Sequence, residues 1–300
     1  MLNIYEQIDS NKKKTTLIMF IFVVFICFIA WVFAQLFDYG WGFVGMALIV
    51  SGIMSFASYY WSDKIILGIS GARPASRKKD FQFYTVTENI CLAAHIPLPK
   101  LYVIDDTAMN AFATGRDPQH AVVCATTGLL DKLNRTELEG VVGHELSHVR
   151  NFDIRLMSIV TILVGMITLL ADWFLRSSAY GRGRREKGSE IQGIMFILGI
   201  FLALLSPLIA KLIQLAISRR HEFLADAGSV KLTRQPSGLI SALQKLSTDR
   251  EPLEAANKAT AHLYIVNPLK NLHSGIGWFA GLFQTHPPID QRVKALEQMM

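Results

Sequence analysis

The residues best suited to chemistry in this sequence are His144, Glu145 and His148 in the segment His144-Glu145-Leu146-Ser147-His148. On a helix, histidines four positions apart lie on one face, so both imidazoles can reach one metal ion. Neutral imidazole suits Zn²⁺. Glu145 can then take a proton from a water in such a site and pass it to the leaving amine of a cleaved peptide. The pattern predicts a hydrolytic zinc site; the simpler alternative is a helix with two solvated histidines.

A catalytic zinc site needs a third protein ligand and an open position. The sequence Val149-Arg150-Asn151-Phe152-Asp153 follows His148, which excludes a third histidine close by in the metzincin spacing. Glu222 is the other option, because Asp226 lies one helical turn further on and could accept a hydrogen bond from a ligand imidazole. From spacing alone, Glu222 is explained equally well as a solvated carboxylate. His221 points about 100° away from Glu222 on a helix and is expected at the surface.

The elements that position this motif belong to a strongly apolar chain. Hydrophobic residues form 51% of the 300 residues and charged residues 18%, and the mean hydropathy is +0.31. So few charges favour a membrane protein over a soluble one. The net charge of +6 comes without basic stretches that alternate with aromatics, so we expect membrane-flanking Lys and Arg rather than nucleic-acid binding. The three cysteines have no metal or redox spacing and suit a reducing compartment.

Apolar runs long enough for a bilayer, which a helix crosses in about 20 residues, occur at 15–37, 41–61, 156–175 and 191–210. The first two are joined by a very short link and predict an uncleaved helical hairpin with aromatic residues at its ends. The last two predict a second membrane hairpin, and the alternative is a pair of buried helices in a large core.

The polar segments between and after these runs are expected to form one catalytic domain. Its predicted elements are a helix at 81–94, strands at 101–104, 110–115 and 121–126, and a helix that carries the His-Glu motif. Thr136 is expected to cap this last helix, with Glu139 completing a capping box. The predicted organisation is an amino tail at 1–14, a membrane hairpin at 15–61, a first catalytic part at 62–155, a second hairpin at 156–210, and a mainly helical second catalytic part at 211–300.

The proposed ligands flank the second hairpin. If His148 and Glu222 bind one ion, the hairpin must cross the membrane an even number of times. At 1.5 Å per residue, both lie roughly 10–20 Å from the apolar boundary, so the metal is expected close to the membrane surface. Lysines and arginines next to the first two runs place the amino end and the catalytic domain in the cytoplasm. The basic segment 182–187 opposes this rule if the second hairpin spans completely.

At these residues the chain resembles the HtpX family of membrane heat-shock metalloproteases, gluzincins related to the CAAX-prenyl endoproteases. The similar segments cover nearly the whole chain: paired amino-terminal membrane runs, Asn110-Ala111-Phe112-Ala113-Thr114-Gly115, Gly143-His144-Glu145-Leu146-Ser147-His148, Asn151, Glu222-Phe223-x-Ala225-Asp226, and Thr285-His286-Pro287-Pro288 with Arg292. The resemblance implies an α+β, predominantly helical fold, with integral membrane helices and a gluzincin-type domain that contains a small β-sheet. It also implies one Zn²⁺ per chain with Glu222 as the third ligand.

The resemblance further implies substrate and location. The segment Asn110, Ala111, Phe112, Ala113 and Thr114 would be an edge strand that pairs with extended polypeptide; the alternative is an ordinary buried strand. The substrates would be misfolded or damaged membrane proteins, cut near their cytoplasmic ends at a bacterial plasma membrane. His286 and Arg292 could bind substrate or the oxyanion. A structural role is an equal explanation for each, for His286 as a histidine held in a rigid turn. Asn151 and Asp153 could equally form local bonds after the zinc helix.

Two other functions compete with a membrane-anchored zinc endopeptidase. An intramembrane protease needs its motif inside an apolar segment, but charged residues surround it at Arg135, Glu137, Glu139 and Arg150. A membrane-bound holdase or scaffold with a structural zinc site would need four protein ligands, and three are identified here. The sequence therefore favours the endopeptidase, with the lipid bilayer and polypeptides as partners. It leaves the oligomeric state open, a homo-oligomer included.

Overall fold

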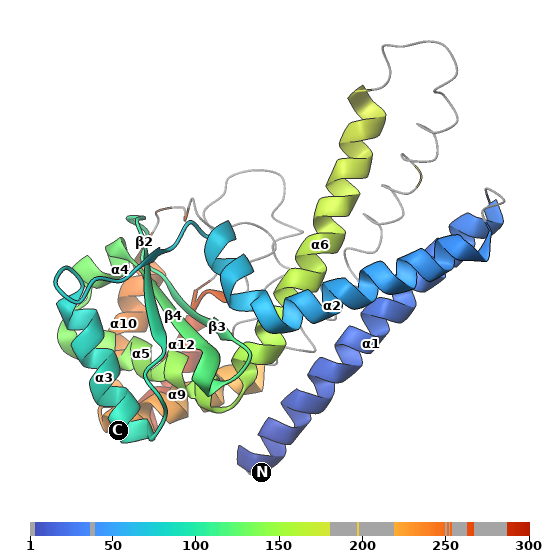
Figure 1. The fold of residues 1–300 in the computed structure, drawn as a ribbon. Coiled ribbons are helices and arrows are strands. Elements are labelled where there is room, and N and C mark those ends of the chain that lie inside the picture. The colour runs from blue at the N-terminus through green and yellow to red at the C-terminus, as the bar shows by residue number, and fades with distance from the viewer. Residues whose placement is uncertain are drawn as a thin grey trace.

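A computed structural model describes residues 4–36, 40–180, 197, 219–249, 251, 253, 263–266 and 287–300. These residues form a mainly helical molecule around one small sheet, with long helices that project from it (Figure 1). The expectations placed on the basic segment 182–187, on the run 191–210 apart from residue 197, and on His286 lie outside the described residues.

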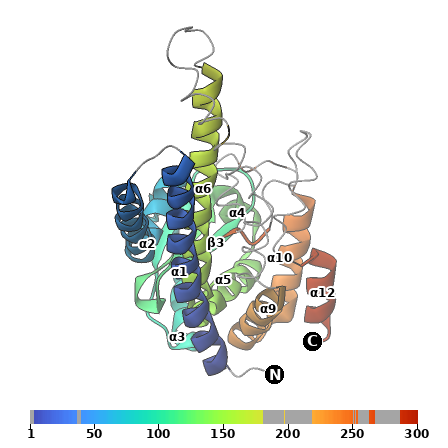
Figure 2. The same ribbon diagram turned by 90° about the vertical axis from the view of Figure 1, so that its right-hand side faces the viewer.

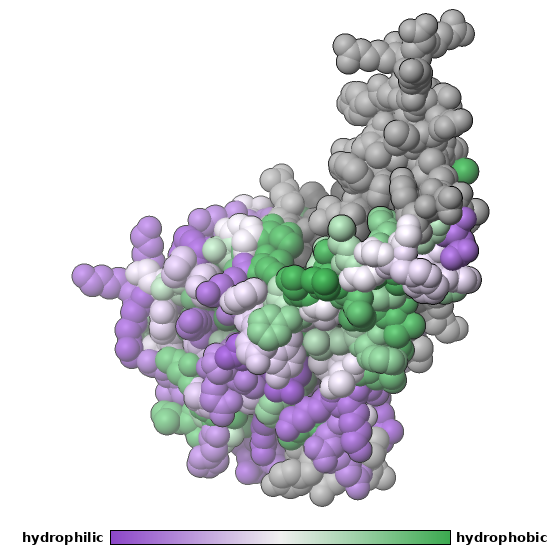
Figure 3. All heavy atoms as spheres, turned by 45° about the vertical axis from the view of Figure 1, so that its right-hand side comes forward, coloured by the Kyte–Doolittle hydropathy of each residue, from purple (hydrophilic) through white to green (hydrophobic). Residues whose placement is uncertain are grey.

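The first two apolar runs form the long helices α1 (Ile4–Leu36) and α2 (Trp41–Ile69), which lie side by side (Figures 1 and 2). Within the described chain, Ile8–Val32 and Trp41–Ile69 are long and apolar enough to cross a membrane. Large apolar side chains stay exposed on them, and Figure 3 shows apolar surface gathered beside a polar domain. Lipid contact accounts for such exposure. Because α1 begins at Ile4, most of the expected amino tail is helical.

The third apolar run lies in α6 (Asp153–Tyr180). The first turns of α6 are buried in the protein, where Leu156, Ile159 and Leu163 belong to one apolar cluster with Phe112. The beginning of the run therefore does not mark a membrane boundary. The predicted separation of roughly 10–20 Å between metal and membrane counted residues from His148 to the start of this run. Because that start is buried in the protein, the count from His148 no longer measures a distance to the membrane.

The sheet contains β1 (Arg73–Pro74), β2 (Lys100–Ile104), β3 (Ala111–Gly115) and β4 (Ala121–Thr126), in the order β1-β2-β4-β3. β2 and β4 are parallel, and β3 is antiparallel to β4 and lies at an edge. The predicted strands and the predicted helix at 81–94, which is α3 (Phe81–Ala94), are confirmed.

Helices complete the domain. They are α4 (Thr127–Lys132), α5 (Arg135–Arg150), α9 (Arg219–Thr233), α10 (Pro236–Thr248) and α12 (Ile289–Glu297). α5 carries the His-Glu motif and runs through the middle, in contact with α3, α9, α10 and β3. Apolar residues on several sides of α5 are buried, so its polar motif residues are held in a rigid, dry surrounding.

The amino end of α5 corrects one prediction. The cap is Asn134, whose Oδ1 accepts from the Glu137 backbone N at 3.0 Å, while Glu137 Oε2 accepts from the Asn134 backbone N at 2.8 Å. The expected box of Thr136 and Glu139 is wrong because Asn134 is at least as strong a cap and also has a glutamate three residues later. Lys245 Nζ of α10 donates to Glu137 Oε2 at 2.7 Å, which ties the start of α5 to its neighbour.

Candidate metal centre

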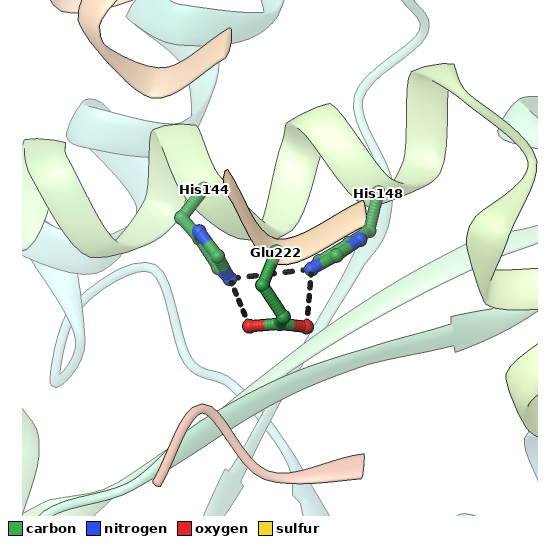
Figure 4. A group of neighbouring side chains, drawn as sticks. All are labelled: His144, His148 and Glu222. Carbon is green, nitrogen blue, oxygen red and sulfur yellow. Dashed lines mark hydrogen bonds and ion pairs between the residues drawn. The ribbon is translucent and has the colours of Figure 1, made fainter. Parts of the chain in front are cut away.

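Three potential ligand side chains converge from α5 and the first turn of α9. Figure 4 shows His144, His148 and Glu222 pointing toward one another from these two helices. The two Nε2 atoms are 3.2 Å apart. Glu222 Oε2 lies 3.7 Å from His144 Nε2, and Oε1 lies 3.6 Å from His148 Nε2. All three side chains are buried, and their ligand atoms lie within 4.8 Å of one another. The structure thus brings together the three ligands expected from the sequence.

The donor atoms fit a tetrahedral divalent ion. His144 Nδ1 lies 2.9 Å from Asp226 Oδ1, and His148 Nδ1 lies 3.0 Å from Asp153 Oδ2. A carboxylate beside Nδ1 favours the tautomer that keeps the proton there and leaves a lone pair on Nε2. Two such lone pairs and the Glu222 carboxylate repel one another unless a proton or a metal cation lies between them. Zinc bonds of about 2.0–2.1 Å set neighbouring ligand atoms about 3.3 Å apart, close to the separation of the imidazoles.

His144 is held from the carboxyl-terminal part of the chain. Asp226, one turn after Glu222 on α9, lies where the sequence placed it and also accepts from Arg292 of α12. The guanidinium approaches both carboxylate oxygens, Nη2 to Oδ1 at 2.6 Å and Nε to Oδ2 at 2.9 Å. Although burial raises the pKa of Asp226, the charge of Arg292 and the hydrogen bonds from His144 and Arg292 lower it to about 2. Asp226 is therefore an anion with its own buried counter-ion.

Arg292 does not occupy the substrate-binding position that the sequence predicted. Its side chain is 1% exposed. It lies behind His144, where it bonds Asp226 and the backbone oxygen of Ile265. Its Nη1 is also 3.6 Å from Glu222 Oε2. Its guanidinium is enclosed by these carboxylates and balances their negative charge.

His148 is held from a different part of the chain. Asp153 opens α6, and its Oδ1 lies 3.0 Å from His221 Nδ1 and 2.7 Å from the Asn11 amide nitrogen of α1. His221 was expected at the surface, but its side chain is only 12% exposed and faces Asp153. It does not lie at the metal centre either. The residue between α5 and α6, Phe152, has a φ of 58°, a backbone conformation that aromatic residues rarely adopt. This turn brings Asp153 back onto His148.

The two imidazoles differ in proton affinity. Burial lowers the pKa of His144 to about 4, and the charge of Arg292 adds to this effect. Burial also opposes the charged form of His148, but the hydrogen bond with Asp153 and the negative charge of Glu222 outweigh it and raise the pKa to about 9. A metal ion must compete with that proton for His148.

Glu145 is 3% exposed and follows His144 on α5. Its negative charge helps to raise the pKa of His148 and of Arg292, so its carboxylate lies within electrostatic reach of both. The cluster of potential ligands identified in the described residues contains His144, His148 and Glu222 without Glu145. Glu145 therefore lies beside the cluster without being one of its potential ligands.

The strand expected to bind substrate, β3, lies at the sheet edge but is buried along its length. Asn110 O accepts from Thr126 N at 3.0 Å, so this carbonyl faces β4. Antiparallel pairing alternates, and the backbone groups of Ala111 and Ala113 therefore face outward. Phe112 packs its ring against Tyr264 at 5.2 Å between centroids, so its side chain is part of the core rather than a substrate contact.

Other parts of the chain already use the two ends of this edge. Ile265 N donates to Ala111 O at 3.0 Å, and the Asn110 amide donates to Val266 O at 3.0 Å. At the other end, Ser158 Oγ of α6 accepts from Gly115 N at 3.2 Å, and the same hydroxyl lies 2.7 Å from Thr114 Oγ1. Among the described residues, the outward backbone groups of Ala113 have no hydrogen-bond partner.

Small residues set the distance between α5 and α9. A Cβ on Gly143 would lie 2.8 Å from Ser229 Oγ, and one on Gly228 would collide with Ser147 Oγ. Ser229 Oγ uses the close approach to donate to Gly140 O at 2.7 Å. Glu222 can therefore reach the histidines because its helix packs almost directly on the backbone of theirs.

Comparison with known proteins agrees with this site. Peptidase family M48 matches residues 77–300. A protein named "Protease HtpX homolog" from Dictyoglomus turgidum is 43% identical over 295 residues, covering 98% of this chain and 94% of the relative. One of the same name from Streptococcus pneumoniae is 42% identical over 303 residues, covering 99% of this chain and all of the relative.

The crystal structure of S. mikatae Ste24p is a distant structural match. It has a TM-score of 0.49 and 20% identity, covering 98% of this chain and 67% of that one. The sequence relatives and the family match decide the assignment: the chain belongs to the HtpX proteases of peptidase family M48 and is a metalloendopeptidase.

Proposed function

We propose that this protein is a zinc-dependent endopeptidase that cuts misfolded or damaged membrane proteins from the cytoplasmic side. The observation that carries the proposal is the convergence of two Nε2 atoms and the Glu222 carboxylate, with each Nδ1 held by a carboxylate of its own. Such an arrangement suits a three-ligand zinc site with an open position, which is the catalytic rather than the structural type.

His144, His148 and Glu222 would hold the ion. Zinc bound there supplies Lewis acidity, which polarises a carbonyl and lowers the pKa of water. Glu145 holds the proton taken from the attacking water and returns it to the leaving amine. Asp226 and Asp153 keep the ring protons on Nδ1, and Arg292 balances the charge of Asp226 while the reaction proceeds.

Substrate would bind as an extended strand along β3. The support is that Ala111 O already accepts an N–H from another stretch of the chain at Ile265, and that Ala113 presents its outward backbone groups next to it. Pairing through the backbone demands little of the substrate side chains, which suits unfolded polypeptides as a class. His286 remains a proposed substrate contact from sequence alone.

The cytoplasmic orientation rests on the basic residues that border the first two apolar runs, including Lys12, Lys13 and Lys14. A reporter enzyme that is active only outside the cytoplasm, fused after Met300, tests it. We expect no activity from that fusion and activity from a matched fusion placed between α1 and α2. The reverse pattern would exclude the orientation.

The test of the reaction compares the native full-length protein with Glu145→Gln, purified in detergent with zinc, on an unfolded casein-type substrate. General-base catalysis contributes about 10²–10⁴-fold, so we expect a loss of cleavage in that range with zinc content unchanged. Glu139→Gln on the same helix, whose carboxylate pairs with Arg135 on the outside, is the matched control and should retain activity.

Glu222→Ala is expected to lose zinc by metal analysis, because Glu222 brings the third ligand. Undiminished cleavage by Glu145→Gln would contradict the mechanism. A native protein that prevents aggregation of casein but never cuts it would instead favour a holdase.

A further inference from the structure

Asn11 is a buried polar side chain in the first turns of the apolar helix α1, with 1% of its surface exposed. Its amide nitrogen donates to Asp153 Oδ1 at 2.7 Å and to the backbone oxygen of Asn151 at 3.1 Å. These partners are 140 and more positions away in the chain. They form the junction between the helix of the His-Glu motif and α6. Asn11 thus links the amino-terminal helix to the edge of the metal centre.

The chemistry of the partners fixes how the amide is turned. A carboxylate and a backbone carbonyl are both acceptors, so the NH₂ group of Asn11 has to face them. Its Oδ1 is buried without a hydrogen-bond partner in the described part of the chain. Burying an unsatisfied acceptor opposes folding, and an apolar residue would serve membrane anchoring better. Anchoring therefore does not account for an asparagine at this position.

The contacts of Asp153 show what Asn11 can do. One carboxylate oxygen, Oδ2, holds His148 Nδ1 at 3.0 Å, and the other, Oδ1, is shared by Asn11 and His221. Fixing Oδ1 from two sides fixes the plane of the carboxylate and hence the direction of Oδ2. The imidazole of His148 is oriented by that oxygen, as metal-ligating histidines commonly are.

The turn that carries Asp153 is held at the same place. Phe152 has a φ of 58°, and the bond from Asn11 reaches the carbonyl just before it, on Asn151. Lys12 lies with its Nζ 4.9 Å from the centroid of the Phe152 ring. Two consecutive residues of α1 therefore contact Asn151 and Phe152 of the strained turn, which helps to keep the carboxylate of Asp153 on His148.

We propose that Asn11 is a positioning residue of the metal centre: through Asp153 it orients His148, so the amino-terminal membrane helix is part of the catalytic unit and not only an anchor. The inference rests on the proposed function in one respect, that His148 is a metal ligand. It adds a residue of α1 that does not touch His148 itself but bonds Asp153, which bonds His148. Loss of a carboxylate that orients a ligand costs about 10–100-fold in metal affinity, so we expect about tenfold for Asn11.

The experiment uses the full-length protein in detergent and reads metal binding rather than proteolysis. Zinc affinity is measured by competition with a chromophoric chelator, and Co²⁺ replaces zinc to report ligand geometry in its visible spectrum. We expect Asn11→Ala to weaken zinc about tenfold and to change the Co²⁺ spectrum. Thr16→Ala is the matched control. Thr16 lies on the same helix, is exposed and bonds only within α1, so its affinity should equal that of the native protein.

A double-mutant cycle tests whether Asn11 acts through Asp153. In the Asp153→Asn background, Asn11→Ala should cause no further loss, because the carboxylate that it orients is gone. Additive losses would overturn the proposal, and so would unchanged affinity in Asn11→Ala. If Asn11→Ala does not fold, Asn11→Asp keeps the side-chain volume but turns an acceptor toward Asp153. It should lose affinity at least as strongly, whereas native affinity would overturn the proposal.

These outcomes are separate from those of the proposed function. Failure of the native protein to cut any polypeptide would remove the proposed reaction, yet zinc affinity would still report on Asn11. Conversely, full cleavage by the native protein with native zinc affinity in Asn11→Ala would leave the reaction intact and remove the positioning role.

Discussion

The two histidines of α5 are held by carboxylates whose charge is compensated in different ways. Behind His144, Asp226 is paired on both oxygens with the permanent cation of Arg292. Behind His148, Asp153 is contacted by the neutral amide of Asn11 and by His221. Burial, with the charge of Arg292, lowers the pKa of His144 to about 4. Burial also acts on His148, but the hydrogen bond with Asp153 and the charge of Glu222 outweigh it and raise its pKa to about 9.

This difference teaches how the site divides its tasks. Burial and the charge of Arg292 outweigh the attraction of Asp226 for a proton on His144, so this imidazole is neutral at neutral pH. A carboxylate without a permanent cation among the described residues orients its imidazole but also favours the protonated form. Helices α9 and α12 supply the first arrangement, whereas α1 and α6, together with His221 of α9, supply the second. Four experiments test whether the two carboxylates differ in this way.

The largest effect is expected from Arg292→Met. Removing one partner from a buried ion pair leaves Asp226 and Glu222 uncompensated, which costs about 3–5 kcal/mol of stability. Unfolding of the metal-free protein in detergent, followed by circular dichroism, measures it. Arg292→Lys retains the charge but not the two-pronged geometry and should lose less. A native unfolding midpoint for Arg292→Met would show that Asp226 does not depend on this cation.

The next effect compares the two carboxylates directly. Asp226→Asn and Asp153→Asn should each weaken zinc binding about 10–100-fold, because each releases one ligand imidazole. Only Asp226→Asn also leaves Arg292 buried without its partner, so it alone should lower the unfolding midpoint strongly. Zinc competition and thermal unfolding on the same samples separate the effects. Equal losses of stability in both variants would contradict the proposed division.

The pH dependence of zinc binding provides a third test. With a pKa of about 9, His148 of the metal-free protein carries a proton at neutral pH, whereas His144, at about 4, does not. Binding then displaces about one proton, so apparent affinity should rise about tenfold per pH unit from pH ~6 to ~8. Asp153→Asn should flatten this slope, because the interaction that raises the pKa of His148 is lost. A hundredfold rise per pH unit would mean that both imidazoles start protonated.

The smallest effect concerns the helix end that both histidines share. Asn134→Ala removes the observed cap of α5 and should cost about 1 kcal/mol of stability. Thr136→Ala, which removes the cap first expected from the sequence, should have almost no effect. Denaturant unfolding measures both variants. Because the cap stabilises the whole of α5, which carries both histidines, Asn134→Ala should leave the zinc affinity of the folded protein unchanged.

The chemistry of the site could be predicted from local spacing, but its support could not. Periodicity puts His144 and His148 on one helix face, and Glu222 and Asp226 on one face of another helix. Spacing alone explained Glu222 equally well as a solvated carboxylate, and the resemblance to the HtpX family is what brought it to the metal site. Asn11 and Asp153 meet across 142 positions, and nothing in the sequence of either segment indicates the partner. The sequence does hold one signal for the contact of Asp153 with His148: an acidic residue that directly follows the motif helix.

The same limit explains the errors in the fold. Elements governed by short-range patterns, such as 81–94 and the strands, were predicted correctly. Two overlapping capping boxes fit the start of α5, and local rules alone did not choose between them. The apolar start of α6 has the composition of a membrane span, yet it is buried against β3, because lipid and a protein core select the same residues. The sequence left a structural role and a substrate contact equally open for Arg292, because burial of a charge depends on partners from distant helices.

The contact of α5 with α9 has a consequence for attempts to move this chemistry elsewhere. Gly143 adjoins the first histidine, and Gly228 follows Asp226 by two positions; a Cβ on either would meet a serine side chain of the opposite helix closer than 3.0 Å, so that serine would have to shift. The metal site is therefore defined by the distance between two backbones as much as by its ligands. A graft that copies the histidines and glutamates onto another helix pair must copy these glycines too, or the third ligand will stop short of the ion.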